Sequence, residues 1–528
     1  MESPTVSIRA ILEQILSGQV RIPAFQRGFV WDPEQVAYFM DSIYKGYPFG
    51  SLLFWRTKSL LKHDRKLGPY DLPSKDPDYP IDYVLDGQQR ITSIFCVFQN
   101  TLPPQRTEDW LDIYFDHTVD EGDPRSSQFR ALEPDAIDPT RHIPLNCFFD
   151  SAAYRKQTSA LEEAVQVRVD AAQQKFKECL IPVQTLRTED RAQVAIVFER
   201  VNRRGVALDT LQLLAAWTWS NDFDLLMKFR QLKERLEEFG FAEVGEDTDL
   251  LLSCCAAVLC SDPAPESLVG MSGADVRDGF ERIENGIYGA IDFLQKQLGV
   301  ETLKNLPYPS LLIPLSVFYA APAGKEINVG AEPLATLKRW FWRACFSRRY
   351  SSQTSRTTRT DIEEMVKLKS GQPSQLGNFP ADLQVSYFTE NQFRLSTANT
   401  NTFILLLAQQ TPLSFLSGAA VDLSKVLQAY NRAEYHHIYP NAYLRKKGIG
   451  DAQINCLANF AIISRAENNK IRSKAPSVYK ADMPGDSKVL QEVLAHALCP
   501  ATMFNDVYDP FVAERANLLL AAATKLMS

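Results

Sequence analysis

The spacing of apolar residues predicts helices over most of the chain and a few short strands near its amino end. Residues 6–17 show the spacing of a short amphipathic helix, and an extended segment is expected around Arg21 to Pro23. Asp32 is suited to cap a helix that Pro33 opens. The apolar residues that share one face of this helix are Val36, Phe39, Met40 and Ile43.

Three later patterns predict further elements of the amino-terminal part. Pro48 and Gly50 break the helix, and "SLLFW" is typical of a buried strand. "DYVLDGQQRITSIFCVFQ" predicts a strand, a tight turn and a helix, and "AQVAIVFERVNRRGVALDTLQLLAAWTW" predicts a helix, a turn and a helix. Residues 57–80 and 118–140 are expected to be irregular.

The rest of the chain is predicted to be mainly helical. Residues 155–178 and 220–395 show helical patterns, with a break at "SRRYSSQTSRTTRT", and the chain ends in a helix, "FVAERANLLLAAATKLM". A chain of 528 residues exceeds one compact core, so two or three domains are expected. We predict a mainly α fold with α+β domains, divided into residues 1–215, a helical middle of residues 216–400, and residues 401–528.

Composition excludes several classes of protein. About 45% of residues are hydrophobic and 23% are charged, the formal net charge is −7, and the nine cysteines contain no C-x-x-C pair. These values indicate a globular protein with reduced thiols, without a zinc ribbon or a uniformly cationic surface. We find neither a signal-peptide pattern nor an apolar stretch suited to span a bilayer, so a cytoplasmic location without membrane contact is expected.

The motif "VLDGQQR" places polar residues where a predicted strand turns into a helix. Asp86 and Gly87 fall in the turn, and Gln88, Gln89 and Arg90 fall in the first helical turn. Such a turn offers backbone N–H groups, a favourable helix dipole and a bidentate guanidinium to a phosphate. The alternative is an ordinary Asp-Gly turn without a ligand.

Two other polar groups suit the same chemistry. Gln26 and Arg27 lie among aromatic residues in "FQRGFVW", a mixture suited to a flat stacking pocket. Asn202 and Arg203, in "FERVNRRG", offer donors that can close over an anion. Surface or core placement is the simpler alternative for each. Neither a Walker-type nor a Rossmann phosphate motif occurs.

A pair of histidines in "EYHHIYP" is the strongest chemical signal of the carboxy-terminal part. A near-neutral imidazole can accept a proton from water or bind a metal, and His436 and His437 would face opposite sides of a regular strand. Asn459 and Asn468 follow, and asparagine oxygens suit a magnesium-like ion. Packing or a surface accident is the alternative for an isolated pair.

Several cationic side chains are candidate phosphate contacts. Lys470, Arg472 and Lys474 follow the last asparagines, and Arg348 and Arg349 lie in the Ser/Thr/Arg-rich break. A solvated loop is the alternative for the break. "RHIPL", residues 141–145, resembles the histidine motif but lacks the asparagines, so a structural role is expected, as for the isolated His63, His117 and His496.

The amino-terminal motifs "IPAFQRGFVW", "GYPFGSLLFW", "YVLDGQQRITS" and "FERVNRRGVAL" together resemble the amino-terminal domain of GmrSD-type proteins. These are modification-dependent (type IV) restriction enzymes and their anti-phage relatives. The resemblance implies a ParB/sulfiredoxin-like fold that binds and hydrolyses an NTP of the ATP or GTP class. The implied nucleotide-binding residues are Gln26, Arg27, Asp86, Gly87, Gln88, Gln89, Arg90, Asn202 and Arg203. The chain departs from the family by reading Asn-Arg-Arg-Gly where Asn-Thr-Gly-Gly is more frequent.

The carboxy-terminal motifs "HIYP", "LANFAIIS" and "NNKIRSKAP" resemble the HNH (His-Me finger) nuclease motif, with its ββα-metal fold. The resemblance implies that His437 is the general base, that Asn459 holds the loop orienting the imidazole, and that Asn468 binds Mg²⁺ or Mn²⁺, with Asn469 as its rival. His436 stands where many relatives have a metal-binding acid, which favours Mn²⁺.

Together these resemblances predict a metal-dependent DNA endonuclease of the type IV restriction kind, cleaving modified foreign DNA under control of an NTP. A homo-oligomer is compatible with the sequence. The alternatives are a nucleotide-gated DNA-binding module with weak or no nuclease activity, an RNase-type toxin, and an NTPase whose nuclease is a separate protein.

Overall fold

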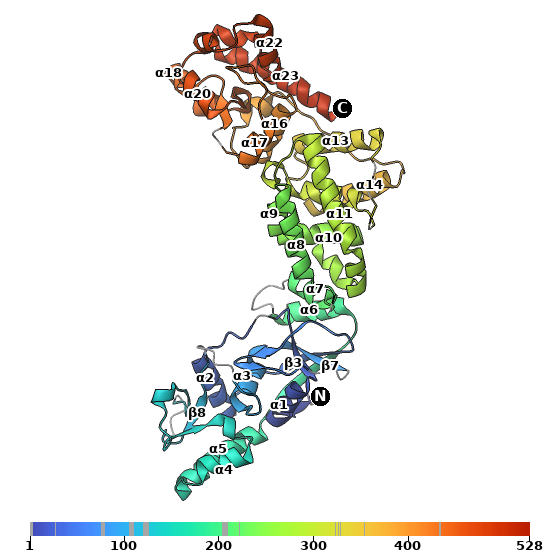
Figure 1. Ribbon diagram of the computed structural model, residues 1–528. Helices are drawn as coiled ribbons and strands as arrows, with labels where there is room; N and C mark the ends of the chain where they lie inside the picture. The colour runs from blue at the N-terminus through green and yellow to red at the C-terminus, as the bar shows by residue number, and fades with distance from the viewer. Residues whose placement is uncertain are drawn as a thin grey trace. The chain divides into compact units, whose positions relative to one another are not determined.

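The computed structural model describes residues 4–26, 28–74, 80–104, 110–119, 126–202, 210–220, 222–322, 324, 325, 327, 329–352, 354–431 and 434–528. The chain forms two compact units (Figure 1). The first comprises Met1–Leu225 and Val269–Ala274, and the second comprises Leu226–Leu268 and Asp275–Ser528. The predicted division of the second unit near residue 400 stays a prediction.

A mixed sheet of six strands organises the first unit, in the order β1-β11-β3-β7-β2-β4. The central strand β7 runs parallel to β2 and antiparallel to β3. It is buried from Ile81 to Leu85 and ends at the predicted Asp-Gly turn. The strands are β1 (Thr5–Ser7), β2 (Val20–Pro23), β3 (Leu52–Thr57), β4 (His63–Asp64), β7 (Ile81–Asp86) and β11 (Leu180–Arg187).

Helices pack on this sheet through two separate apolar cores. Helix α2 (Pro33–Tyr44) begins at the predicted cap, where Asp32 and Gln35 form a reciprocal capping box, and its predicted apolar face is buried. The other helices of the first unit are α1 (Ile8–Ser17), α3 (Gln88–Phe98), α4 (Ser151–Thr158), α5 (Glu163–Glu178), α6 (Arg191–Asn202) and α7 (Thr210–Thr218).

Two segments predicted to be irregular contain strands, which corrects the sequence analysis. Within 57–80 lie β4 and the small β5–β6 hairpin, and within 118–140 lies β9. These strands are two or three residues long, too short for an alternating pattern to distinguish them from a loop. They are β5 (Lys66–Leu67), β6 (Tyr70–Asp71), and the sheet β10-β8-β9 of His142–Pro144, Ile113–Asp116 and Phe129–Ala131.

The second unit is almost entirely helical, as predicted. The expected break between α13 and α14 is shorter than the Ser/Thr/Arg-rich motif, because α14 begins at Thr354. Its helices before residue 430 are α8 (Leu225–Glu238), α9 (Ala242–Glu246), α10 (Thr248–Cys260), α11 (Gly273–Leu298), α12 (Leu312–Tyr319), α13 (Ala331–Phe346), α14 (Thr354–Lys369), α15 (Ser386–Glu390), α16 (Ala398–Ala408) and α17 (Leu423–Ala429).

The histidine pair lies in a two-stranded antiparallel ladder near the carboxy end. Strand β12 (Tyr435–His437) pairs with β13 (Phe460–Ile462), and α20 (Arg465–Ile471) follows β13 directly. Short helices connect the two strands, and the remaining helices pack on one apolar core. They are α18 (Asn441–Lys446), α19 (Asp451–Ile454), α21 (Pro476–Tyr479), α22 (Ser487–His496) and α23 (Tyr508–Met527).

The predicted fold class, mainly α with α+β parts, is confirmed by this arrangement. Across the described ranges, every helix is too short or too polar to cross a lipid bilayer.

Candidate functional site

Strand β7 leads through Gly87 directly into α3, as the sequence predicts. Gly87 caps α3 with a φ of 90°, in the left-handed region that favours glycine. A Cβ atom at this position would lie 2.5 Å from the side chain of Leu52. Both the backbone conformation and the close approach of β3 therefore require glycine in the Asp-Gly-Gln-Gln-Arg motif.

Arg90 and Asp86 form an ion pair across the first turn of α3. The Nη2 atom of Arg90 lies 2.8 Å from the Asp86 carboxylate and also donates to the carbonyl oxygen of Ser51, at 2.9 Å. The Nε atom of Arg90 is buried without a hydrogen-bond partner in the described part of the chain. The two side chains remain 24% and 38% exposed, respectively, so a ligand can reach this pair.

Two glutamines of the predicted nucleotide site hold the neighbouring backbone. Gln89 accepts a hydrogen bond from the amide of Val30 (2.9 Å) and donates one to the carbonyl oxygen of Gly28 (3.2 Å). Gln26 donates to the carbonyl oxygen of Val84. These bonds attach the aromatic segment after Phe25 to β7 and α3. Gln88 is buried beside them, with 8% exposure.

A pocket of about 610 Å³ adjoins Arg90. Its aromatic wall is continuous, since the ring centroids of Trp31 and Phe39 are 5.4 Å apart and those of Phe39 and Phe49 are 5.8 Å apart. Such a wall suits a planar ring, and Arg90 supplies a cation at its edge. The full lining is Trp31, Asp32, Glu34, Gln35, Tyr38, Phe39, Ser42, Pro48, Phe49 and Arg90.

Two of the predicted nucleotide-binding residues are not among the described ones, and a third ends a helix. Arg27 and Arg203 lie outside the described residues. Asn202 is the last residue of α6. The predicted nucleotide-binding residues that the structure brings together are therefore Gln26, Asp86, Gly87, Gln88, Gln89 and Arg90.

His437 lies at the end of β12, opposite Phe460 on β13. Its Nε2 atom is 3.0 Å from Oδ1 of Asn455, and its ring centroid is 4.2 Å from that of Phe460. The imidazole is partly buried. A hydrogen bond at one edge and an aromatic ring at one face thus restrain its orientation.

Asn459 is fully buried and bonds the loop that follows His437. Its Oδ1 atom accepts from the amide of Tyr439 (3.0 Å), and its Nδ2 atom donates to the carbonyl oxygens of Tyr439 (3.2 Å) and Ile454 (2.9 Å). The Asn459 backbone carbonyl also accepts from Ile438. These contacts restrain the loop after His437, and the catalytic role that the resemblance implies for Asn459 stays a prediction.

Asn468 lies in the middle of α20, and two other residues cap the start of this helix. Ser464 and Glu467 form a reciprocal capping box, and Glu467 also accepts from the Ser414 hydroxyl (2.7 Å). Glu467 is thereby committed to structure. Within the described ranges the side chain of Asn468 makes no hydrogen bond, so its amide oxygen remains available as a ligand. Asn469 is exposed.

A metal site built from the predicted ligands would have few protein donors. His436 pairs with Ala461 in the ladder, and its imidazole and the side-chain amide of Asn468 are the two predicted donors. In the part of the chain that the structure describes, no group of three or more His, Cys, Asp or Glu side chains is arranged to hold a metal ion. A mixed nitrogen and oxygen pair suits Mn²⁺ better than Mg²⁺.

The cationic candidates near α20 differ in their contacts. Lys470 is exposed on the helix. Arg472 ends α20 with a φ of 52° and donates to the Asn469 carbonyl at 3.0 Å. Lys474 pairs with Asp482 at 2.5 Å. Their predicted contacts with DNA stay predictions.

Arg348 and Arg349 are both engaged within the second unit. Arg348 donates to the side chains of Asn399 and Asn391, each at 3.0 Å. Arg349 forms two hydrogen bonds to the buried Asp361, at 2.7 and 3.2 Å. Trp340 and Tyr350 donate to the same carboxylate. These bonds give Arg349 a structural role, and DNA binding by either arginine stays a prediction.

Sequence reasoning missed two residues beside the histidine ladder. Asn455 bonds His437, as described above, and Arg515 is fully buried on α23. Arg515 donates to the carbonyl oxygens of Ala458 (2.6 Å) and Ala497 (3.2 Å), and burial lowers the pKa of its guanidinium. A charged residue in the apolar face of a predicted helix was the available signal for Arg515, and no local pattern indicated Asn455.

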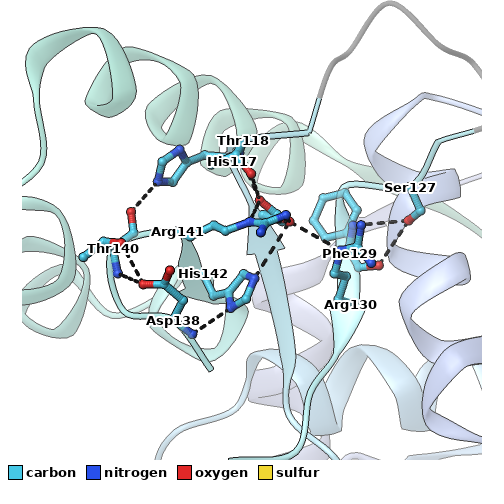
Figure 2. Close-up of polar contacts among 10 residues, drawn as sticks. His117, Thr118, Ser127, Phe129, Arg130, Asp138, Thr140, Arg141 and His142 are labelled. Atoms are coloured by element: carbon cyan, nitrogen blue, oxygen red, sulfur yellow. Dashed lines mark hydrogen bonds and ion pairs between the residues drawn. The ribbon is translucent and has the colours of Figure 1, made fainter. Parts of the chain in front are cut away.

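A second polar cluster surrounds the buried carboxylate of Asp116 at the end of β8. Arg141 donates to it at 2.8 Å, Thr118 at 2.6 Å, and Arg130 and His142 lie 3.4 and 3.8 Å away. Figure 2 shows Arg141 and His142 on one side of this cluster and Arg130 on the other. Burial opposes ionisation of Asp116, but the hydrogen bonds from Arg141 and Thr118 prevail and lower its pKa to about 2. The "RHIPL" segment thus contributes to an internal network, in agreement with its expected structural role.

Comparison with known proteins gives two similarities. An uncharacterized protein of Methanocaldococcus jannaschii, MJ0686, is 24% identical over 533 aligned positions, which cover 91% of this chain and 87% of the relative. Residues 8–219 match the family described as "GmrSD restriction endonuclease, N-terminal domain". This range contains β7, α3 and the pocket beside Arg90. The amino-terminal part of the chain is therefore similar to the N-terminal domain of GmrSD restriction endonucleases.

Proposed function

We infer that the protein is a metal-dependent DNA endonuclease of the type IV restriction kind, controlled by an NTP bound in the first unit. The observation that supports this proposal is the order of β12, β13 and α20: His437 ends β12, Asn459 directly precedes β13, and Asn468 lies in α20, which follows β13. The match of residues 8–219 to a restriction endonuclease domain supports the choice of DNA as the substrate.

His437 serves in this proposal as the general base. A neutral imidazole at the end of β12 accepts the proton of the attacking water, and Asn459 holds the loop that fixes the ring's position. Lys470 and Arg472 contact the phosphodiester backbone from the exposed side of α20.

His436 and Asn468 would hold the divalent ion. A bound ion would polarise the scissile phosphate and stabilise the leaving oxygen. The available side-chain amide of Asn468 fits this role, and two protein ligands would leave positions for water and phosphate oxygens.

The nucleotide is proposed to bind beside Arg90. The aromatic wall from Trp31 to Phe49 suits the base, and Arg90 with the first turn of α3 suits a phosphate. Asp32 and Glu34 line the same pocket, so the charge of the phosphates is better accommodated as a metal–nucleotide complex.

A nucleotide-gated DNA-binding module is the second candidate function. It is favoured by the scarcity of acidic or histidine ligands, since no cluster of three or more is found in the described ranges. In this alternative the histidine ladder binds DNA without cutting it.

The deciding experiment measures cleavage and NTP hydrolysis in parallel. Unmodified, glucosylated-hydroxymethylcytosine and phosphorothioate DNA would be incubated with Mg²⁺ or Mn²⁺, with and without NTPs, using wild type and His437→Ala. We expect the wild type to cut one modified DNA, and His437→Ala to lose cleavage but keep NTP hydrolysis. Binding of DNA without cleavage under every condition would favour the second candidate, and cleavage of matched RNA alone would indicate an RNase.

A further inference from the structure

The side chain of Asn455 has a determined orientation between two partners. Its Nδ2 atom donates to the carbonyl oxygen of Asp451 at 2.8 Å, and its Oδ1 atom lies 3.0 Å from Nε2 of His437. A carbonyl oxygen only accepts, so the nitrogen of the amide must face Asp451 and the oxygen must face the imidazole. An amide oxygen also only accepts, and therefore Nε2 of His437 must carry a hydrogen.

We propose that Asn455 is the positioning residue of His437, fixing the Nε2–H tautomer so that the lone pair of the neutral ring resides on Nδ1. This role rests on the proposed function, in which His437 accepts a proton from water. With the opposite tautomer, the ring would present an N–H group where an acceptor is required. Asn455 acts on the ring and need not touch the DNA.

The backbone of Asn455 is held by a segment that precedes the histidine ladder. The backbone amide of Phe393 donates to the carbonyl oxygen of Asn455 at 2.8 Å. The backbone amide of Leu457 donates to the carbonyl oxygen of Asn391 at 2.9 Å. Gln392 and Cys456 form an antiparallel bridge between these bonds. The backbone carbonyl of Asn455 and the backbone amide of Leu457 are thus both hydrogen-bonded to this segment, which limits the movement of the Asn455 side chain.

Stacked rings complete the support of the imidazole. The rings of Phe393 and Phe460 are nearly parallel, with an interplanar angle of 15° and centroids 4.3 Å apart. Phe460 in turn contacts the His437 ring. Phe393 is 3% exposed and Phe460 is fully buried. One short segment therefore restrains both the hydrogen-bond acceptor and the aromatic stack beneath His437.

The test compares Asn455→Leu, which removes the acceptor at similar volume, with Asn455→Asp, which keeps an acceptor. The matched control is Asn517→Leu, because exposed Asn517 also donates to a carbonyl four residues earlier, that of Ala513. The tautomer of His437 would be read from ¹⁵N chemical shifts of the metal-free full chain, labelled at histidine and assigned with His437→Gln. Cleavage would be measured as kcat and KM for DNA.

We expect the Nε2–H tautomer in the wild type, Asn455→Asp and Asn517→Leu, and a mixture of tautomers in Asn455→Leu. The kcat of Asn455→Leu should fall about a hundredfold with little change in KM, and Asn455→Asp should recover part of it. An Nδ1–H tautomer in the wild type, or an unchanged tautomer in Asn455→Leu, would overturn the role. If the wild type cuts no DNA, the proposed function fails, whereas loss of the tautomer in Asn455→Leu would still support the positioning of the ring by Asn455.

Discussion

The buried amide of Asn459 bonds both the amide and the carbonyl group of Tyr439, at 3.0 and 3.2 Å. One side chain thereby fixes both polar groups of a single peptide residue two positions after His437. Since Asn459 has no exposure to solvent, water cannot replace these bonds. The segment that follows β12 is consequently attached by hydrogen bonds to a side chain in the buried core.

Replacement of Asn459 by alanine should therefore weaken both structure and cleavage. The buried amide and carbonyl of Tyr439 and the carbonyl of Ile454 would lose their partner, at a cost of about 3 kcal/mol in the free energy of unfolding. Urea denaturation would measure this cost, with Asn517→Ala as an exposed control. A normal unfolding midpoint together with normal cleavage would contradict the holding role.

The Arg90→Ala variant should bind NTP more weakly while the histidine site keeps its structure. The substitution removes a guanidinium that lies beside the aromatic pocket and pairs with Asp86. Loss of a charge-assisted phosphate contact should weaken binding at least tenfold, and hydrolysis should decrease with it. Calorimetric titration with ATP and GTP would measure the affinity, with exposed Arg155→Ala as the control. Equal affinities of Arg90→Ala and wild type would place the nucleotide elsewhere.

The elements that the sequence predicted correctly are those with local causes. The capping of α2 by Asp32 needs only Gln35, three residues later, and the β7–Gly87–α3 turn needs only a strand, a glycine and a helix. The pairing of β1 with β11 joins Thr5 to Pro182, and no local pattern specifies such a partner. Short strands such as β9 depend entirely on pairing of this kind.

The candidate sites divide in the same way. His437 and Asn459 could be proposed from the sequence because they lie in motifs whose order and spacing resemble the HNH motif. Asn455 was not recognised, since its bond to His437 spans 18 positions and arises from the fold of the connecting segment. Likewise, nothing local showed that Gln89 would bond the backbone near Val30. Residues that support a site through tertiary contacts need the structure.

The network of Asp116 should make stability fall at low pH. The pKa of Asp116 is about 2 in the folded state, below its ordinary value of 3.8, so the folded state favours the ionised carboxylate. This contribution is complete well above pH 3.8 and is lost as the pH falls toward 2. Asp116→Asn should cost about 2 kcal/mol at pH 6, and its deficit relative to wild type should shrink between about pH 5 and pH 2.

Urea denaturation at several pH values would measure this difference, and Asp135→Asn, an exposed aspartate of the same region, is the control. A deficit that stays constant as the pH is lowered would show that ionisation of Asp116 does not contribute.

Salt dependence of DNA binding should separate Lys470 from Arg349. Lys470 is exposed on α20, so Lys470→Ala should remove one phosphate contact and reduce the slope of log K against log salt by about 0.9. Arg349 donates instead to buried Asp361, so Arg349→Ala should leave the slope unchanged and lower the free energy of unfolding by about 3 kcal/mol. Fluorescence anisotropy at several salt concentrations, alongside urea denaturation, would measure both effects. The reverse assignment, with a reduced slope in Arg349→Ala and none in Lys470→Ala, would move the DNA-binding surface from α20 to the start of the α13–α14 connection.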